Sequence, residues 1–130
     1  MAIKVFCDGS FRDGKGGIGV VAFREKIKLF VIGRRVKVKN NNEAEFLAIM
    51  AGLKALKSKK NEEILIISDS KTVMRELNDH KESHVKKFNE YAVKILKEAK
   101  KFKNLKFKWM GRENTMEADT IAKNITAKEK

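Results

Sequence analysis

The stretch I-L-I-I-S-D-S at residues 64–70 decides the fold that we expect for this chain. Its first four residues are branched and apolar, which suits a strand buried on both faces in the centre of a helix-covered parallel sheet. Asp69 then places an ionisable group directly after the buried run. The stretch therefore predicts a central strand whose carboxyl end opens onto a polar site.

Three strands are expected before the first helix. Apolar side chains alternate over residues 3–8, which predicts the first strand. Residues 20–24 and 27–36 predict two more strands, joined as a hairpin. The glycine-rich segment at residues 9–19 is interpreted as a turn between the first two strands. This part of the chain therefore predicts an antiparallel three-strand meander.

The apolar period becomes helical over residues 43–57, where Asn42 and Glu45 are placed as a capping box. Further elements are predicted as helices over residues 70–77, 85–102 and 115–127, and as a strand over residues 105–109. This order predicts an α/β fold with a five-stranded mixed sheet. The meander and two parallel strands, added by right-handed crossovers, would be flanked by helices.

Length and composition indicate a soluble globular protein. The 130 residues suit a single domain spanning residues 1–130, and 42% apolar residues are too many for a disordered chain. No apolar run is long enough to cross a bilayer, and the amino terminus enters a strand pattern instead of a signal peptide. We therefore expect a cytoplasmic protein with no membrane partner. Cys7 is the lone cysteine and cannot form an internal disulfide.

The charge balance points to a polyanionic partner. The chain has 30 Lys and Arg residues against 17 Asp and Glu residues, for a formal net charge of +13. Such a surface binds nucleic acid because neutralising phosphates releases counterions. The alternative is a lysine-rich solvated surface with no ligand. Charge alone therefore favours nucleic-acid binding without establishing it.

Three carboxylates are predicted to meet at one edge of the sheet. Asp8 ends the first strand, Asp69 follows the central strand, and Glu45 lies near the start of the first helix. Functional groups gather beyond the carboxyl ends of neighbouring parallel strands. Like charges at close range repel unless cations neutralise them, and carboxylate oxygens suit Mg²⁺ and Mn²⁺. The set therefore predicts a metal cluster suited to two-metal phosphoryl transfer.

Each acid also has a purely structural interpretation. Asp8 could be a turn residue, Asp69 the N-cap of the next helix, and Glu45 half of a capping box. Each interpretation is reasonable when taken singly. The coincidence of all three acids with aligned strand ends and a basic chain favours the metal cluster.

The chain resembles type 1 ribonuclease H over about residues 3–126. The resemblance is carried by four motifs in the family's order: D-G-S at 8–10, N-N-x-x-E at 41–45, D-S at 69–70 and N-x-x-x-A-D-x-x-A at 114–122. It implies a ribonuclease H-like fold and an endonuclease that hydrolyses the RNA strand of RNA/DNA hybrids. It also implies two Mg²⁺ ions, with Mn²⁺ as a substitute, and products with 5′-phosphate and 3′-hydroxyl ends.

The resemblance also implies roles for individual residues. The catalytic and metal-binding acids would be Asp8, Glu45, Asp69 and Asp119. Asp8 would bridge both metals. Substrate contacts, including contacts to the 2′-hydroxyls that distinguish RNA from DNA, would come from Gly9, Ser10, Asn40, Asn41, Asn42, Ser70 and Lys71.

One departure concerns a histidine that many bacterial relatives carry just before the last aspartate. Here the segment is Gly111-Arg112-Glu113-Asn114, which is similar to the histidine-free variant of some archaeal and plant-like members. Either Arg112 and Glu113 serve as a product-release loop, or turnover is slower. His80 and His84 are poor substitutes because they lie in a connection rich in Lys and Glu, where a surface histidine is the default.

A second departure is the short stretch between Asp69 and Trp109, which leaves no room for the basic, Trp-rich handle of some relatives. We expect either the lysine face of the helix at 85–102 or scattered lysines to supply binding, with looser selectivity between hybrid and double-stranded RNA. The alternatives are a junction resolvase-like nuclease on the same fold, or a catalytically silent hybrid-binding module. The four acids argue against the silent module. We expect a monomer with no obligate protein partner.

Overall fold

A computed structural model describes residues 2–79 and 90–127 of the chain and contains the predicted five-stranded mixed sheet. The strands are β1 (Ile3–Arg12), β2 (Lys15–Arg24), β3 (Ile27–Val36), β4 (Glu63–Ser68) and β5 (Asn104–Trp109). Their order in the sheet is β3-β2-β1-β4-β5. The first three strands form an antiparallel meander, and β1 with β4 and β4 with β5 are parallel pairs. The predicted fold class is confirmed.

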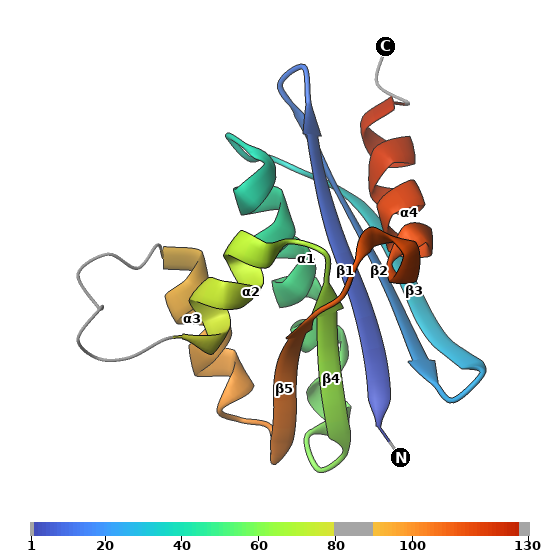
Figure 1. Cartoon of the computed structure of the whole chain (residues 1–130), viewed down its shortest axis with the longest axis vertical. Helices are drawn as coiled ribbons and strands as arrows, with labels where there is room; N and C mark the ends of the chain where they lie inside the picture. The colour runs from blue at the N-terminus through green and yellow to red at the C-terminus, as the bar shows by residue number, and fades with distance from the viewer. Residues whose placement is uncertain (1, 80–89, 128–130) are drawn as a thin grey trace.

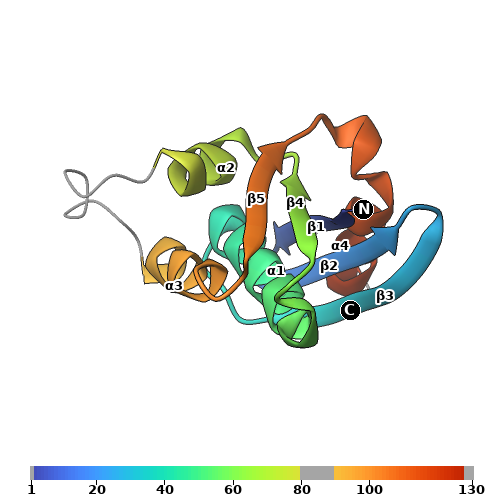
Figure 2. The same cartoon turned by 90° about the horizontal axis from the view of Figure 1, so that it is seen from below.

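Helices cover both faces of the sheet. They are α1 (Asn41–Ala55), α2 (Lys71–Asn78), α3 (Glu90–Ala99) and α4 (Met116–Ala127), with the short 3₁₀ turns η1 (Lys57–Lys59) and η3 (Arg112–Asn114). Figure 1 shows α1 on one side of β1 and α4 on the other. Figure 2 shows α2 and α3 at the β5 end of the sheet, away from α4. No helix in the described ranges has the length and hydropathy needed to span a membrane.

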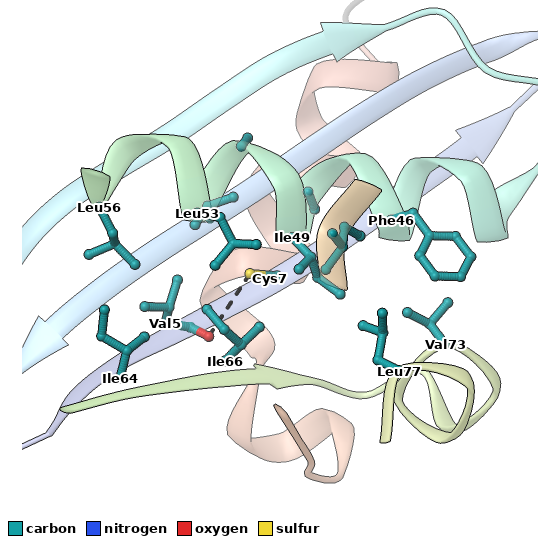
Figure 3. Packing of buried hydrophobic residues seen from close by; sticks show 14 of the residues in the cluster. Val5, Cys7, Phe46, Ile49, Leu53, Leu56, Ile64, Ile66, Val73 and Leu77 are labelled. Carbon is teal, nitrogen blue, oxygen red and sulfur yellow. Dashed lines mark hydrogen bonds between the residues drawn. The ribbon is translucent and has the colours of Figure 1, made fainter. Parts of the chain in front are cut away.

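The main core lies between the sheet and α1. Figure 3 shows Ile49 and Leu53 of α1 facing Val5 of β1 and Ile64 and Ile66 of β4. All five are at most 2% exposed. Burial of such side chains contributes roughly 1.5–3 kcal/mol each. This packing holds β1, the middle strand of the sheet, and its neighbour β4 firmly against α1.

The glycine-rich segment is a long hairpin and not the predicted turn. β1 continues to Arg12, and only Asp13 and Gly14 connect it to β2. Both have positive φ, 51° and 78°, as a two-residue type I′ turn requires. The prediction failed because glycine inside a strand normally weakens it. Here glycine allows close packing, since a Cβ at Gly9 would collide with the α1 backbone at Ala44.

The helix caps also differ from the predicted ones. Asn40 caps α1 because its Oδ1 accepts the Glu43 N–H at 2.9 Å, and Glu43 in turn accepts the Lys39 N–H at 2.9 Å. The capping box predicted for Asn42 and Glu45 is therefore wrong by two residues. These two residues lie inside α1.

The predicted helix over residues 85–102 is shorter at its carboxyl end. Residues 85–89 lie outside the described residues, as do His80 and His84, and α3 ends at Ala99. Beyond it the Lys103 N–H donates to the Lys60 carbonyl oxygen at 2.8 Å. This bond ties the chain leading into β5 to the turn that precedes β4.

Candidate metal centre

Two of the predicted acids lie beyond the end of the parallel ladder. The last pair between β1 and β4 is Phe6 with Ile67. Asp8 is not the end of β1, as the sequence suggested, because β1 continues as a hairpin to Arg12. Asp8 instead lies in the part of β1 that is no longer paired with β4. Asp69 directly follows the end of β4. Both carboxylates therefore leave the sheet where the two strands separate.

The third acid, Glu45, reaches the same place from α1. It is buried in the first turns of the helix, and its Oε1 accepts the backbone N–H of Gly9. Because glycine has no Cβ, α1 can approach β1 at Gly9 closely enough for this hydrogen bond to form. The helix is thereby fixed against the strand that carries Asp8.

The three structural interpretations of these acids are wrong. Asp8 lies in a paired strand and not in a turn. The N-cap of α2 is Ser70, whose hydroxyl accepts the Val73 N–H at 3.3 Å, and not Asp69. Glu45 takes no part in the α1 cap. None of the three carboxylates is accounted for by the local structure of its own segment.

One oxygen each from Asp8, Glu45 and Asp69 lies within 4.8 Å of the others. Two oxygens bound to one Mg²⁺ ion are at most about 4 Å apart, and those on a larger cation slightly more. The donor set is made of hard oxygen ligands alone, the kind that Mg²⁺, Mn²⁺ and Ca²⁺ prefer. The residues therefore fit a divalent metal ion with only small side-chain adjustments.

Asp119 joins the cluster from the first turn of α4. It shares a side-chain hydrogen bond with Asp8, and its Oδ2 lies 3.3 Å from Lys123 Nζ. Burial alone would raise the pKa of Asp119, but the bond to Asp8 and the pairing with Lys123 and Arg112 lower it. The surroundings of Asp119 therefore favour its ionised form.

The pKa values of Asp8 and Glu45 shift in the opposite direction. Burial raises the pKa of Asp8 to about 10, helped by the charge of Glu45 and by hydrogen bonds with Asp119 and Glu45. Burial also raises the pKa of Glu45 to about 7, against the lowering effect of hydrogen bonds from Asp8 and Gly9. Without a cation the centre therefore retains protons at neutral pH.

Two cations stand at the rim of the centre. Arg112 Nε lies 3.3 Å from Asp69 Oδ2, and this hydrogen bond raises the pKa of the guanidinium. Sequence reasoning included Arg112 but missed Lys123. The signal for Lys123 was its position four residues after Asp119 in a predicted helix, where an acid and a lysine pair. The rim cations would attract a phosphate group approaching the acids.

A cavity of about 380 Å³ contains this centre. Its lining includes the four acids, the predicted residues Gly9, Ser10, Asn41 and Arg112, and three residues that the sequence did not single out for the site: Phe11, Arg12 and Lys123. Asn41 Oδ1 accepts the Phe11 N–H at 2.8 Å, which joins the start of α1 to the β1 hairpin. Four site predictions therefore meet beside the acids.

The remaining predicted residues lie outside this cavity. Asn40 and Asn42 line a neighbouring hollow of about 890 Å³. Ser70 caps α2, while Glu113 lies in η3 with its carboxylate beside Gly111.

Lys71 belongs to a contact that the sequence did not reveal. Its Nζ lies 4.9 Å from the centroid of the Trp109 ring, a cation–π distance. Trp109 Nε1 donates to the backbone carbonyl of Asp69 at 3.0 Å. The end of β5 therefore fixes the backbone of a cluster acid.

The fold and this site define a ribonuclease H-like protein. The chain belongs to the reverse transcriptase-like family, whose sequence profile matches residues 6–125. No curated protein sequence matches significantly.

Solved structures agree with this assignment. LC11-RNase H1, isolated from compost by a metagenomic approach, is 27% identical with a TM-score of 0.83, and the match covers 98% of this chain and 96% of that one. The same enzyme in complex with an RNA/DNA hybrid matches at 25% identity over 97% of both chains, with a TM-score of 0.83. The RNase H1 of the archaeon Halobacterium salinarum has the same fold, at 19% identity and a TM-score of 0.81 over 96% of this chain and 97% of that one. The resemblance to type 1 ribonuclease H is confirmed, and the histidine-free variant stays a prediction.

Proposed function

We propose that this protein is a metal-dependent endonuclease that hydrolyses the RNA strand of RNA/DNA hybrids. The observation that carries the proposal is the convergence of three carboxylates within 4.8 Å at the end of the β1–β4 ladder. Support comes from the fold that the chain shares with LC11-RNase H1, which has been solved with an RNA/DNA hybrid. The +13 charge suits a polyanionic substrate.

The proposed metal ligands are Asp8, Glu45, Asp69 and Asp119. Two Mg²⁺ ions, replaceable by Mn²⁺, would supply an activated water and stabilise the leaving 3′-oxygen, giving 5′-phosphate and 3′-hydroxyl ends. Asp8 would be the ligand shared by both ions, because it interacts with both Glu45 and Asp119. The protons that Asp8 and Glu45 hold would leave as metal binds. The chain thus contributes fixed charge and position, with no covalent step of its own.

The chain's other residues would position the hybrid. Gly9, Ser10 and Asn41 line the cavity beside the acids. Asn40 and Asn42 extend this surface along the start of α1. We assign these residues to the 2′-hydroxyls and the adjoining backbone, since the 2′-hydroxyl distinguishes RNA from DNA. Ser70 and Lys71 would contact the flanking strand.

Arg112 is proposed to serve in product release in place of the family histidine. Its guanidinium pairs with Asp69 at the cavity mouth, and its side chain is 66% exposed. A cation there can bind the newly formed phosphate and draw it from the metal ligands. Glu113 would shape the same loop, because its carboxylate packs over Gly111.

The test compares labelled RNA/DNA hybrid, double-stranded RNA, double-stranded DNA and a four-way junction, each with Mg²⁺, Mn²⁺ or EDTA. The wild type should cut the RNA strand of the hybrid only with metal, and Asp69→Asn should abolish cutting. Asp79→Asn is the matched control, because it removes an equal charge from the exposed end of α2. Cutting by Asp69→Asn or in EDTA would refute the mechanism, and binding without cutting would indicate a silent module.

A further inference from the structure

A second hollow, of about 500 Å³, lies between α3 and β5. This α3–β5 groove is lined by the apolar residues Val93, Leu96, Ala99, Leu105 and Phe107 and by Lys97 and Lys100. Its size is within the range of ligand-binding pockets. It shares no residue with the cavity of the candidate metal centre. β5 is the edge strand of the sheet opposite β3, so the groove is at the end of the sheet away from α4 (Figure 2).

The floor of the groove is apolar and firmly supported. Leu96, Leu105 and Phe107 are partly buried and pack against the main core. Val93 of α3 lines the same groove and is 46% exposed, so the apolar lining extends to the solvent-exposed surface. The groove therefore offers a preformed apolar surface that solvent reaches.

Two lysines, Lys97 and Lys100, border this apolar floor. Residues 90–103, which form α3 and the segment leading to β5, contain five lysines and two glutamates. One of those acids, Glu98, is paired with Lys101 at 2.7 Å, and the charges of Lys54 and Lys60 also act on it. The bond between Lys103 and Lys60 brings the lysine-rich turn after α1 to the same end of α3. The field around the groove is strongly positive.

We propose that the α3–β5 groove docks an acidic segment of a partner protein whose leucine, isoleucine or phenylalanine side chains fill the apolar floor. Lys97 and Lys100 would pair with its carboxylates. The charge complementarity that selects this occupant disfavours a second copy of this chain, because two chains of charge +13 repel. A nucleic-acid backbone satisfies the lysines but leaves the aliphatic floor unfilled.

The experiment measures fluorescence anisotropy of a short labelled peptide in which aspartate alternates with leucine or phenylalanine. We expect a dissociation constant on the order of 10–100 μM for the wild type. Two control peptides replace the apolar residues by serine or the aspartates by lysine, and each should bind roughly tenfold more weakly or worse.

Variants locate the binding. Lys97→Glu/Lys100→Glu should weaken peptide binding by roughly tenfold, and Val93→Ser should weaken it severalfold. Lys4→Glu/Lys26→Glu is the control, since it changes the net charge equally at exposed positions elsewhere and should leave binding nearly unchanged. Nuclease activity with short hybrids should be unchanged in Val93→Ser, which keeps every lysine.

Three results would overturn the proposal. The first is no peptide binding at concentrations up to about 1 mM. The second is equal binding of the serine peptide, which would reduce the effect to charge alone. The third is a specific loss of hybrid or single-stranded RNA binding in Lys97→Glu/Lys100→Glu relative to the control pair, which would assign the lysines to nucleic acid.

Discussion

Asp8 and Asp69 occupy equivalent positions, each two residues beyond the last pair of the β1–β4 ladder, Phe6 with Ile67. Side chains two residues apart on a strand share a face, so the ladder sets both the depth and the direction of Asp8. Asp69 follows the end of β4, and its backbone is fixed by the indole of Trp109. The spacing of the two acids is thus a property of strand register.

Replacing Asp8 by Asn should stabilise the metal-free protein while abolishing cleavage. Asp8 is only 4% exposed among other acids, and an amide, which is neutral without taking up a proton, removes the cost of protonating this carboxyl at neutral pH and can donate to Glu45 and Asp119. We expect a gain of about 2 kcal/mol at neutral pH, measured by urea unfolding in EDTA. If the variant has a lower free energy of unfolding than the wild type, the buried carboxyl does not destabilise the metal-free protein.

The stability of the metal-free protein should carry a pH signature. The folded pKa values of Asp8, about 10, and Glu45, about 7, lie above the usual values of 3.8 and 4.5. The folded state therefore binds more protons than the unfolded state in these windows, so the free energy of unfolding falls as pH rises through them. Urea unfolding in EDTA at several pH values checks this. The slope should be smaller in Asp8→Asn, and equal slopes would contradict the expectation.

Metal should reverse that loss of stability. A divalent ion neutralises the carboxylates, so Mg²⁺ or Mn²⁺ should raise the Tm of the wild type, and more at pH 8 than at pH 6, where protons compete. Calorimetric titration in buffers of different ionisation enthalpy should reveal proton release on binding. Asp69→Asn should lose most of the Tm shift, whereas Asp79→Asn should keep it. A shift that does not depend on pH would argue against the protonated centre.

Removing Arg112 should slow product release more than chemistry. If its guanidinium draws the product phosphate from the centre, Arg112→Ala should lower the steady-state rate by about tenfold and leave the single-turnover rate nearly unchanged. Arg75→Ala, on the exposed side of α2, is the control. An equal decrease of both rates would instead assign Arg112 to the chemical step.

Two glycine variants should separate packing from backbone strain. Gly9→Ala forces a Cβ into the α1 backbone, so we expect a loss of about 3 kcal/mol or more in urea unfolding and weaker metal binding. Gly14→Ala meets no neighbour but has a φ of 78°, so it should cost only about 1 kcal/mol. The reverse order would refute the packing role of Gly9.

Much of this fold could be predicted from the sequence because the local pattern of each segment agrees with its place in the fold. The apolar run at 64–67 predicts a buried strand. Asp8, Glu45 and Asp69 are conspicuous because they are ionisable residues next to segments that predict a buried core. Other features depend on contacts that sequence does not display. Gly9 and Gly19 lie within strands although glycine has a poor strand propensity, because helices pack closely against them.

The N-cap of α1 and the hydrogen bond between Trp109 and Asp69 also depend on contacts that the sequence does not display. Asn40, Asn41 and Asn42 are all good caps, and two nearby glutamates make alternative boxes possible, so the sequence alone does not select Asn40 as the N-cap. The sequence places Trp109 at the end of the last predicted strand, but it does not show that the indole nitrogen donates to the Asp69 carbonyl. Long-range partners of this kind become visible only with the fold.

The hydrogen bond between Asp8 and Asp119 joins the first strand to the last helix of the described chain. During synthesis the ribosome therefore releases three of the four acids well before the fourth. The centre cannot be complete until α4 packs on β1 and β2. A nascent chain surrounded by RNA would thus lack its complete metal centre until the residues that form α4 have left the ribosome.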